Sequence, residues 1–191
     1  AGSSTGASAG SQEESLTVVC GAMEDLCQAW TKSFTEKTGI KTSFVRLSSG
    51  ETVARLEAAK ANPEFDVWHG GPVDGYGAAV EKGLIKAYDS PAAADIPEKY
   101  KDPDHNWTGV YIGVLGFCSN KVVLDELGVD VPKKWDDLLN PKLKGQISTA
   151  HPSTSGTAFT TLWTQTILQG GEDQALSWMK KLNNNVLQYS K

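Results

Sequence analysis

The sequence is poor in histidine, cysteine and methionine and has no long apolar run. Its 191 residues include 3 His, 3 Cys and 2 Met. His69, His105 and His151 show neither i, i+4 pairing nor an H-E-x-x-H motif, so we expect no metal site. The longest apolar run, Val110 to Cys118, is interrupted by two glycines and is far shorter than the roughly 18–20 residues that span a bilayer. We therefore expect no transmembrane segment in this chain.

Motifs of several common enzyme classes are also missing. There is no G-x-S-x-G, Walker or G-x-G-x-x-G sequence, and the sequence presents no nucleophile–base pair. With 18 Lys and Arg against 23 Asp and Glu, the formal charge is −5, which argues against a nucleic-acid surface. A composition of 39% hydrophobic and 21% charged residues is ordinary for a globular protein. We expect no cofactor, no nucleic-acid partner and no enzymatic activity.

The first residues, AGSSTGASAG, carry no charge and no side chain larger than Thr. Such a segment has too little apolar area to offset its ordering entropy, so we interpret residues 1–14 as a flexible tether. A tether of this kind suits a protein that an N-terminal lipid holds at a membrane surface. The alternative is a remnant of cloning or of a loop.

Strand and helix patterns alternate along the first half of the chain. Helix 24–38 should pack on a sheet through a face formed by Leu26, Ala29, Trp30, Ser33 and Phe34. The alternation predicts a parallel sheet with right-handed crossovers. The expected strands are 16–20, 40–45 and 65–68, and the helices are 24–38, 48–61 and one from Asp74 to Gly83.

A second series of elements begins after about residue 120. We expect helices at 121–127, 156–169 and 173–182, one helical turn at 135–139 and a strand at 145–149. A further strand starts at Val186, and the chain stops soon afterwards, which suggests that it ends inside a fold. We therefore expect an α/β protein with a first lobe at 15–112, and a hinge crossover and partial second lobe at 113–191.

Two loops place hydroxyl groups and a glycine at the start of a predicted helix. Free backbone N–H groups and the helix dipole favour an anion at such a position. The structural alternative is that these hydroxyls only cap their helices. One loop in each lobe favours an anion clamp. The loops are Ser48, Ser49 and Gly50 in the first lobe, and Ser153, Thr154, Ser155, Gly156 and Thr157 in the second.

A third loop, Trp68-His69-Gly70-Gly71, follows a predicted strand directly. Its glycines leave room for a ligand, and its aromatic ring and histidine offer a stacking or donor surface. The alternative is a tight turn with Trp68 in the core.

Cys20 and Cys27 lie seven residues apart, one at a strand end and the other in the following helix. In an exported protein they could close a small loop as a disulfide and leave Cys118 unpaired. The alternative is a pair of small buried thiols. We predict the disulfide.

Several short motifs, in their order and spacing, resemble the extracellular solute-binding proteins of bacterial ABC importers. The resemblance covers about Ser15 to the last residue and is strongest in the branch that binds ferric ion, sugar phosphates or phosphonates. The motifs are Thr38-Gly39-Ile40, Arg46-x-Ser48-Ser49-Gly50-Glu51, Phe65-Asp66-Val67-Trp68-His69-Gly70-Gly71-Pro72, Gly83-Leu84-Ile85, Trp135-x-Asp137-Leu138-Leu139-x-Pro141-x-x-x-Gly145 and His151-Pro152-Ser153-x-Ser155-Gly156-Thr157.

The resemblance implies a type II periplasmic-binding-protein fold, in which two α/β lobes close around a ligand. It places 111–120 on the first crossover, and it implies a longer chain whose remainder would complete the second lobe. It also implies an extracytoplasmic location, either periplasmic or as a cell-surface lipoprotein, and a membrane permease as partner.

The resemblance leaves three functional hypotheses open. In the ferric branch an acidic or His ligand comes early in the chain, but the loop Cys20-Gly21-Ala22-Met23 has none. We therefore expect an organic phosphate, sugar phosphate or phosphonate as ligand, with Trp68 and His69 on its non-phosphate part. A ferric ion on Tyr189, Glu51 and Asp74 is the alternative. An enzyme on a similar two-lobed fold is the alternative from a different class.

Overall fold

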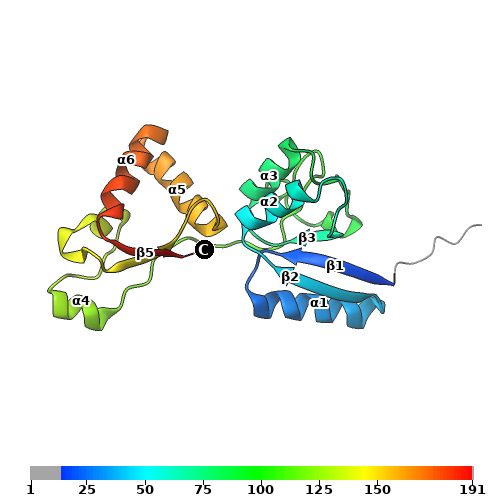
Figure 1. Cartoon of the computed structure of the whole chain (residues 1–191), viewed down its shortest axis with the longest axis horizontal. Helices are drawn as coiled ribbons and strands as arrows, with labels where there is room; N and C mark the ends of the chain where they lie inside the picture. Colours follow the sequence, from blue (N-terminus) through cyan, green and yellow to red (C-terminus); the bar gives the residue numbers. More distant parts are fainter. Residues whose placement is uncertain (1–13, 191) are drawn as a thin grey trace, which may run out of the picture.

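The computed structural model describes residues 14–190, which form two α/β lobes joined by an extended segment (Figure 1). The predicted tether lies outside the described residues, apart from Glu14. The predicted alternation of strands and helices is confirmed in both lobes. No helix within residues 14–190 has both the length and the apolar character to cross a membrane.

The first lobe is built on a three-stranded parallel sheet in the order β2-β1-β3. Its strands are β1 (Ser15–Cys20), β2 (Lys41–Arg46) and β3 (Val67–His69). Because β1 lies in the centre, Val18 pairs with both Phe44 and Val67, and Val19 is fully buried. All three strands are parallel, so their carboxyl ends, and the loops that follow them, lie at the same edge of the sheet.

Three helices cover this sheet, one on one face and two on the other (Figure 1). They are α1 (Glu24–Thr38), α2 (Ser49–Ala58) and α3 (Val73–Glu81). On the α1 face, Val18, Cys20 and Cys27 form the core, and Trp30 and Phe44 pack against it. On the opposite side, Lys82 after α3 forms an ion pair with Glu57 of α2 at 2.9 Å.

The packing face of α1 and the start of α3 differ from the sequence prediction. The buried residues of α1 are Cys27 and Thr31, whereas Leu26 and Phe34 of the predicted packing face are 43% and 40% exposed. The disulfide draws the side of the helix that carries Cys27 onto the sheet. Asp74 does not begin α3, because Pro72 takes the N-cap position and the helix starts one residue earlier.

The second lobe contains a pair of parallel strands with helices packed against them. Helices α5 and α6 lie together on one side of the strands, and α4 lies on the other (Figure 1). Asn185, 3% exposed, fixes the start of β5 by donating to the carbonyls of Leu138 and Asn140 at 2.8 and 2.9 Å. The elements are α4 (Lys121–Leu127), β4 (Ile147–Ala150), α5 (Gly156–Gln169), α6 (Glu172–Asn183) and β5 (Val186–Ser190).

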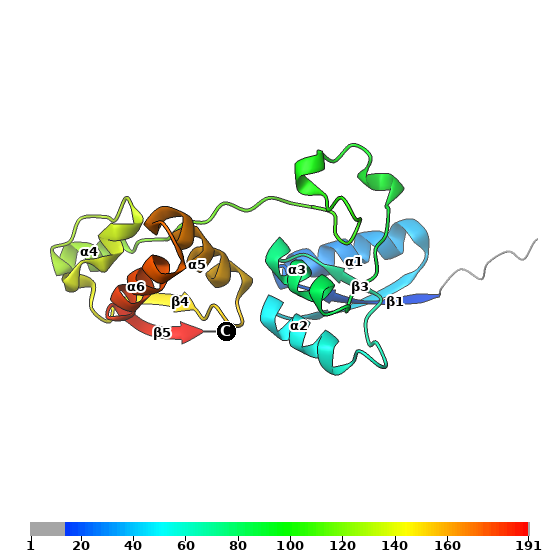
Figure 2. The ribbon, with the colours of Figure 1, turned by 90° about the horizontal axis from the view of Figure 1, so that it is seen from above.

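The segment 109–120 runs from one lobe to the other without helix or strand (Figure 2). Val114 in its middle is 96% exposed, and a Cβ added at Gly113 or Gly116 would meet no atom within 4 Å. This segment, here called the crossover, is therefore held by few contacts along its central part. The rest of the second lobe approaches the first at a separate place, near the N-terminal ends of α2 and α5.

Candidate functional site

The two hydroxyl-rich loops predicted from the sequence meet each other between the lobes. The backbone N–H of Gly50, in the first turn of α2, donates to the carbonyl of Thr154 at 3.0 Å. Thr154 lies two residues before α5, so the N-terminal ends of α2 and α5 approach each other across the lobes. We call this region, formed by residues 48–50, 71–72 and 153–157, the inter-lobe junction.

Glycine is required at two positions of the inter-lobe junction. A Cβ on Gly156 would lie 2.5 Å from both Pro72 Cγ and Ser49 Oγ, and one on Gly50 would overlap the Ser153 carbonyl oxygen. Contacts this short do not occur between real side chains, so any other residue would force the loops apart. A glycine in each loop was expected to let a ligand approach the backbone. In the structure, the lack of a Cβ at Gly50 and Gly156 lets the two lobes approach each other.

In the first loop, Ser48 and Ser49 have different roles. The N–H and the hydroxyl of Ser48 both donate to the carboxylate of Glu51, at 3.2 and 2.6 Å. The capping alternative therefore accounts for Ser48. The hydroxyl of Ser49 instead points into the inter-lobe junction, 3.3 Å from where a Cβ on Gly71 would stand. Both serines are only 8% exposed.

The second loop folds back on His151. The Nδ1 atom of His151 accepts from the N–H of Ser153 at 3.1 Å and lies 2.7 Å from the Ser153 hydroxyl. Ser155 caps α5 by accepting from the N–H of Ala158 at 3.2 Å. Among the described residues, the N–H groups of Gly156 and Thr157 have no hydrogen-bond acceptor. These two donors sit at the positive end of the α5 dipole, where an anion is favoured.

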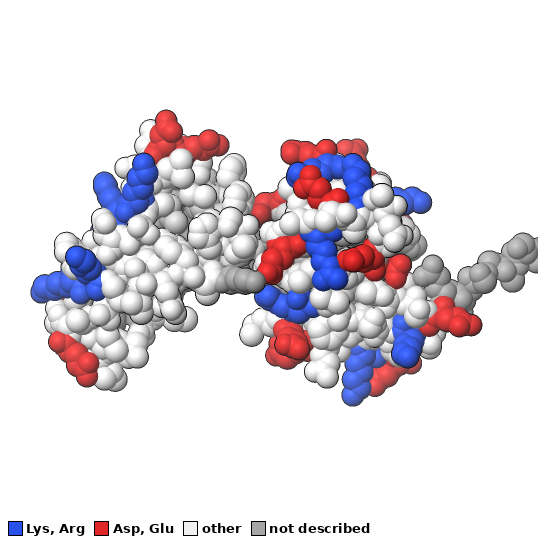
Figure 3. Space-filling model, in the orientation of Figure 1, with Lys and Arg blue, Asp and Glu red and all other residues white. Residues whose placement is uncertain are grey.

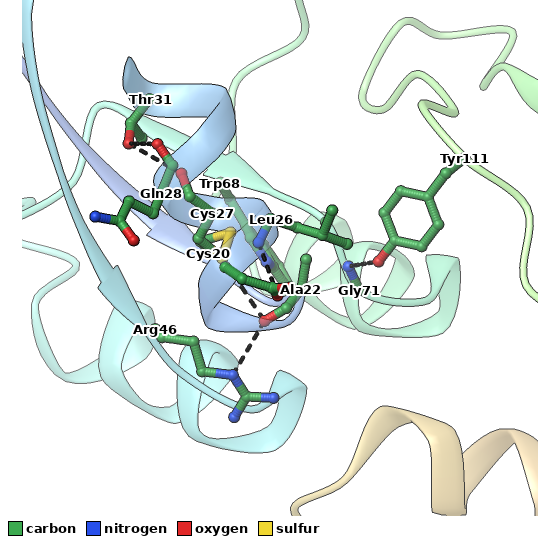
Figure 4. The surroundings of a disulfide bond; sticks show 12 residues. Cys20, Ala22, Leu26, Cys27, Gln28, Thr31, Arg46, Trp68, Gly71 and Tyr111 are labelled. Carbon is green, nitrogen blue, oxygen red and sulfur yellow. Dashed lines mark hydrogen bonds between the residues drawn. A yellow bond between two sulfur atoms is a disulfide. The ribbon is translucent and has the colours of Figure 1, made fainter. Parts of the chain in front are cut away.

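The Gly70-Gly71 turn adds a further backbone donor. Both glycines are in the left-handed region, with φ of 84° and 90°, which favours glycine. The N–H of Gly71 donates to the phenolic oxygen of Tyr111 at 2.9 Å (Figure 4). The turn therefore lies between the inter-lobe junction and the first residues of the crossover.

Trp68 and His69 pack on opposite faces of the sheet. Trp68 stacks on Tyr76 of α3 with ring centroids 4.0 Å apart, and its buried Nε1 has no hydrogen-bond partner among residues 14–190. His69 lies against Trp30 of α1 with centroids 4.2 Å apart, and burial lowers its pKa. His69 is therefore favoured in its neutral form, and Trp68 is largely engaged with the core.

A cavity of about 1650 Å³ adjoins the inter-lobe junction on the side of the crossover. Its lining includes the Trp68–Gly71 turn, Tyr76, Tyr111 and Thr157. Ser48, Ser49 and Gly50 do not line it. Thr157 and Gly71 thus belong to both the cavity and the inter-lobe junction, so a ligand in the cavity could reach the donors of α5 and of the turn.

Sequence reasoning missed three residues near this site. Arg46 ends β2 and donates from Nε to the carbonyl of Ala22 at 3.1 Å, and the rest of its guanidinium extends past this loop (Figure 4). Its position two residues before Ser48 is a signal that could have identified it. The other two missed residues are Trp30 and Tyr111, whose ring centroids are 6.0 Å apart. They come from a helix and the crossover, so no local pattern joins them.

The loop after β1 is closed covalently. Cys20 and Cys27 form the predicted disulfide, with Cα atoms 6.1 Å apart (Figure 4). The disulfide fixes the loop whose Ala22 carbonyl accepts from Arg46. Cys118 lies in the crossover, where it is free and exposed.

Charge around the site is local rather than extended. Acidic and basic side chains are interspersed over the first lobe on the face seen in Figure 3, and much of the second lobe there is uncharged. Within residues 14–190, no group of three or more His, Cys, Asp or Glu side chains could hold a metal ion.

Comparison with known proteins relates the chain to binding proteins. A solved periplasmic binding protein, AfuA from Actinobacillus pleuropneumoniae with exogenous fructose-6-phosphate bound, is 43% identical, with a TM-score of 0.87 over 94% of this chain and 58% of that chain. An uncharacterized protein of Haemophilus influenzae is 44% identical over 92% of this chain and 52% of its own length. A putative 2-aminoethylphosphonate-binding periplasmic protein of Salmonella typhi is 28% identical over 94% of this chain and 53% of its own length.

These relatives agree with the fold predicted from the sequence. The chain spans about half the length of the curated relatives it matches. The family described as bacterial extracellular solute-binding protein matches residues 72–190, which is more than half of the chain. An extracellular family agrees with the extracytoplasmic location that the sequence motifs implied. The chain therefore belongs to the bacterial extracellular solute-binding proteins.

Proposed function

We propose that this chain is part of the extracytoplasmic solute-binding component of an ABC importer, which captures a small organic phosphate, sugar phosphate or phosphonate between its lobes and delivers it to a membrane permease. The relatives whose names or structures mention fructose-6-phosphate or 2-aminoethylphosphonate support this ligand class. The predicted N-terminal lipid anchor falls outside the described residues and remains a prediction.

One observation carries the proposal: the N-terminal ends of α2 and α5 converge on one place between the lobes. The N–H groups of Gly156 and Thr157, which have no acceptor within residues 14–190, and the hydroxyl of Ser49 lie there together. Several donors that converge on one anion give charge-assisted hydrogen bonds, which are roughly twice as strong as neutral ones. A phosphate or phosphonate group has enough oxygens to accept from both lobes at once, and it would thereby link them.

Arg46 would supply positive charge to this arrangement. Its anchoring bond to Ala22 leaves four guanidinium N–H groups for other acceptors, since Arg has five donors in total. The net charge of −5 would not attract an anion from a distance, so affinity must come from local donors. On this proposal the phosphate end lies at the inter-lobe junction and the carbon skeleton extends into the cavity.

The geometry of Ser153 and His151 argues against a nucleophile–base pair. The Nδ1 atom of His151 accepts from the backbone N–H of Ser153 as well as facing its hydroxyl, so this pair closes a local turn. An activated serine would also need a third group that orients the imidazole through its other nitrogen. Among the described hydrogen bonds, the other ring nitrogen of His151 has no partner. We therefore propose binding without turnover.

The ferric-ion alternative is weaker because two of its three predicted ligands are engaged elsewhere. The Glu51 carboxylate accepts from Ser48, and the Tyr189 hydroxyl donates to Asn183 at 2.8 Å. Burial raises the pKa of the third, Asp74, which disfavours the ionised form that a hard metal ion requires.

Calorimetric titration of the complete protein that carries this chain tests the proposal. Fructose 6-phosphate and 2-aminoethylphosphonate should be titrated in parallel with ferric citrate. We expect binding of at least one phosphorus-containing compound, and about tenfold weaker binding in Ser49→Ala, because a hydrogen bond to a charged group contributes about 1.5–3 kcal/mol. Ser43→Ala, an exposed serine of β2, is the matched control. Binding of iron alone, or steady consumption of either compound, would reject this function.

A further inference from the structure

We propose that Tyr111 holds the start of the crossover against the inter-lobe junction by accepting a hydrogen bond from the Gly71 N–H. A ligand oxygen must then displace the tyrosine before it can accept from the same N–H. The inference rests on the proposed function for the identity of the competing oxygen. The hydrogen bond between Tyr111 and Gly71 lies within this chain and is present without any ligand.

The contact joins two parts of the molecule that are distant in the sequence. The N–H of Gly71 and the hydroxyl oxygen of Tyr111 are 2.9 Å apart and 40 residues apart in the chain (Figure 4). Gly71 follows β3 and belongs to the first lobe, while Tyr111 lies at the start of the crossover. The bond therefore ties the start of the crossover to the Gly70-Gly71 turn at the inter-lobe junction.

The tyrosine ring packs on an aromatic side chain of the first lobe. It faces Trp30 of α1, with ring centroids 6.0 Å apart and ring planes inclined by 30°. Tyr111 is nevertheless 50% exposed, and it lines the cavity of about 1650 Å³. A side chain with this exposure can turn away without opening a hole in the core, unlike Tyr76, which stacks fully on Trp68.

The Gly71 donor lies where the proposed ligand would need it. The Ser49 hydroxyl is 3.3 Å from the position of a Cβ on Gly71, so this glycine is next to the N-terminal end of α2. A backbone N–H is a single donor, and while it serves the Tyr111 oxygen it is not available to another acceptor. An entering phosphate or hydroxyl oxygen would therefore replace the phenol, and the start of the crossover would be released.

The alternative is that Tyr111 itself binds the ligand or only supports the fold. The two hypotheses predict changes of opposite sign when the hydroxyl is removed. If Tyr111 competes with the ligand, Tyr111→Phe frees the Gly71 donor and binding becomes tighter. If Tyr111 contacts the ligand or merely stabilises the turn, binding becomes weaker or stays the same.

The test compares wild-type protein, Tyr111→Phe and Ser43→Ala by calorimetry with fructose 6-phosphate and 2-aminoethylphosphonate. Ser43 is an exposed residue of β2 that does not line the cavity, so it controls for the loss of a side-chain hydroxyl. We expect about three- to tenfold tighter binding in Tyr111→Phe, which corresponds to one net hydrogen bond, and no change in Ser43→Ala. Weaker or unchanged binding in Tyr111→Phe overturns the inference.

Amide hydrogen exchange at Gly71, measured by NMR on the unliganded protein, provides a second readout. The exchange should be faster in Tyr111→Phe than in wild type, and unchanged in Ser43→Ala. If neither compound binds the wild-type protein, the proposed function fails, but the exchange rate still decides on the Tyr111–Gly71 tie. Equal Gly71 exchange in wild type and Tyr111→Phe overturns the inference, whatever the titrations show.

Discussion

Substitution of Gly156 by alanine should separate the lobes at the inter-lobe junction. The added methyl group would lie 2.5 Å from Pro72 Cγ and from Ser49 Oγ, whereas ordinary contacts are 3.4–4 Å. The two surfaces must therefore move apart by about 1 Å, or their packing must distort. Overpacking of this kind costs about 1–3 kcal/mol. If the cost falls on the closed arrangement alone, its population relative to an open one decreases roughly 5- to 150-fold.

Electron–electron distance measurements between spin labels on the two lobes can detect this change. Lys32 on α1 and Lys180 on α6 are exposed and suit replacement by labelled cysteines, once the free Cys118 has been changed to serine. Gly77→Ala is the matched control, since a Cβ there meets no atom within 4 Å. We expect Gly156→Ala alone to lengthen the mean distance and to weaken binding of fructose 6-phosphate. An unchanged distance distribution, with circular dichroism confirming the fold, would refute the reasoning.

Three further predictions concern the disulfide, the site arginine and the buried histidine. Thiol counting on denatured, unreduced protein should give one thiol, and three thiols would contradict the disulfide. The double variant Cys20→Ser, Cys27→Ser should have a free energy of unfolding in urea that is lower by about 2–3 kcal/mol, because the unfolded chain is no longer restricted by a closed loop. Arg46→Gln should weaken binding of fructose 6-phosphate about tenfold. Arg55, which forms an ion pair with Glu64, is the control, and Arg55→Gln should leave binding unchanged. An equal loss of affinity in both variants would indicate a general effect of net charge. Burial lowers the pKa of His69 below its ordinary 6.5, so the unfolded chain takes up this proton first as the pH falls. The unfolding free energy should therefore decrease below about pH 6.5, and His69→Gln should flatten this slope; parallel slopes would show that other groups cause it.

Helix ends could be predicted well because the signals that set them are local. The bounds expected for α1, α4 and α5 agree with the structure. Each of these helices ends at a glycine in the left-handed conformation, Gly39, Gly128 and Gly170, with φ between 64° and 90°. A residue that can adopt this conformation at little cost ends a helix whatever the rest of the chain does.

Strand bounds and packing faces were predicted less well because partners distant in the sequence decide them. The third strand was expected at 65–68 but lies at Val67–His69. Asp66 turns its carboxylate onto the N–H of Thr17 at 2.8 Å, so regular pairing with β1 starts one residue later. The buried side of α1 likewise follows from the covalent link at Cys27 rather than from the spacing of its largest apolar side chains.

In the candidate site, too, local features could be predicted from the sequence, whereas contacts between distant residues could not. The loops at residues 48–50, 68–71 and 153–157 could be selected because each follows a strand of a parallel sheet. That Gly50 would donate to Thr154 could not be foreseen, since it depends on how two separately folded lobes are placed. Trp68 stacks on Tyr76, as in the alternative in which it belongs to the core, but it also lines the cavity, so its contact with a ligand stays a prediction.

The exposed middle of the crossover offers an insertion site for converting this protein into a fluorescent biosensor. Its middle carries Val114 at 96% exposure between Gly113 and Gly116, at which an added Cβ would meet nothing within 4 Å. An insertion at this point would disturb little packing, and exposed loop positions of this kind tolerate inserted domains. A circularly permuted fluorescent protein placed there would have one end attached to each lobe. If a solute closes the lobes as proposed, their relative motion would change its brightness, and the chain would become an optical reporter of that solute.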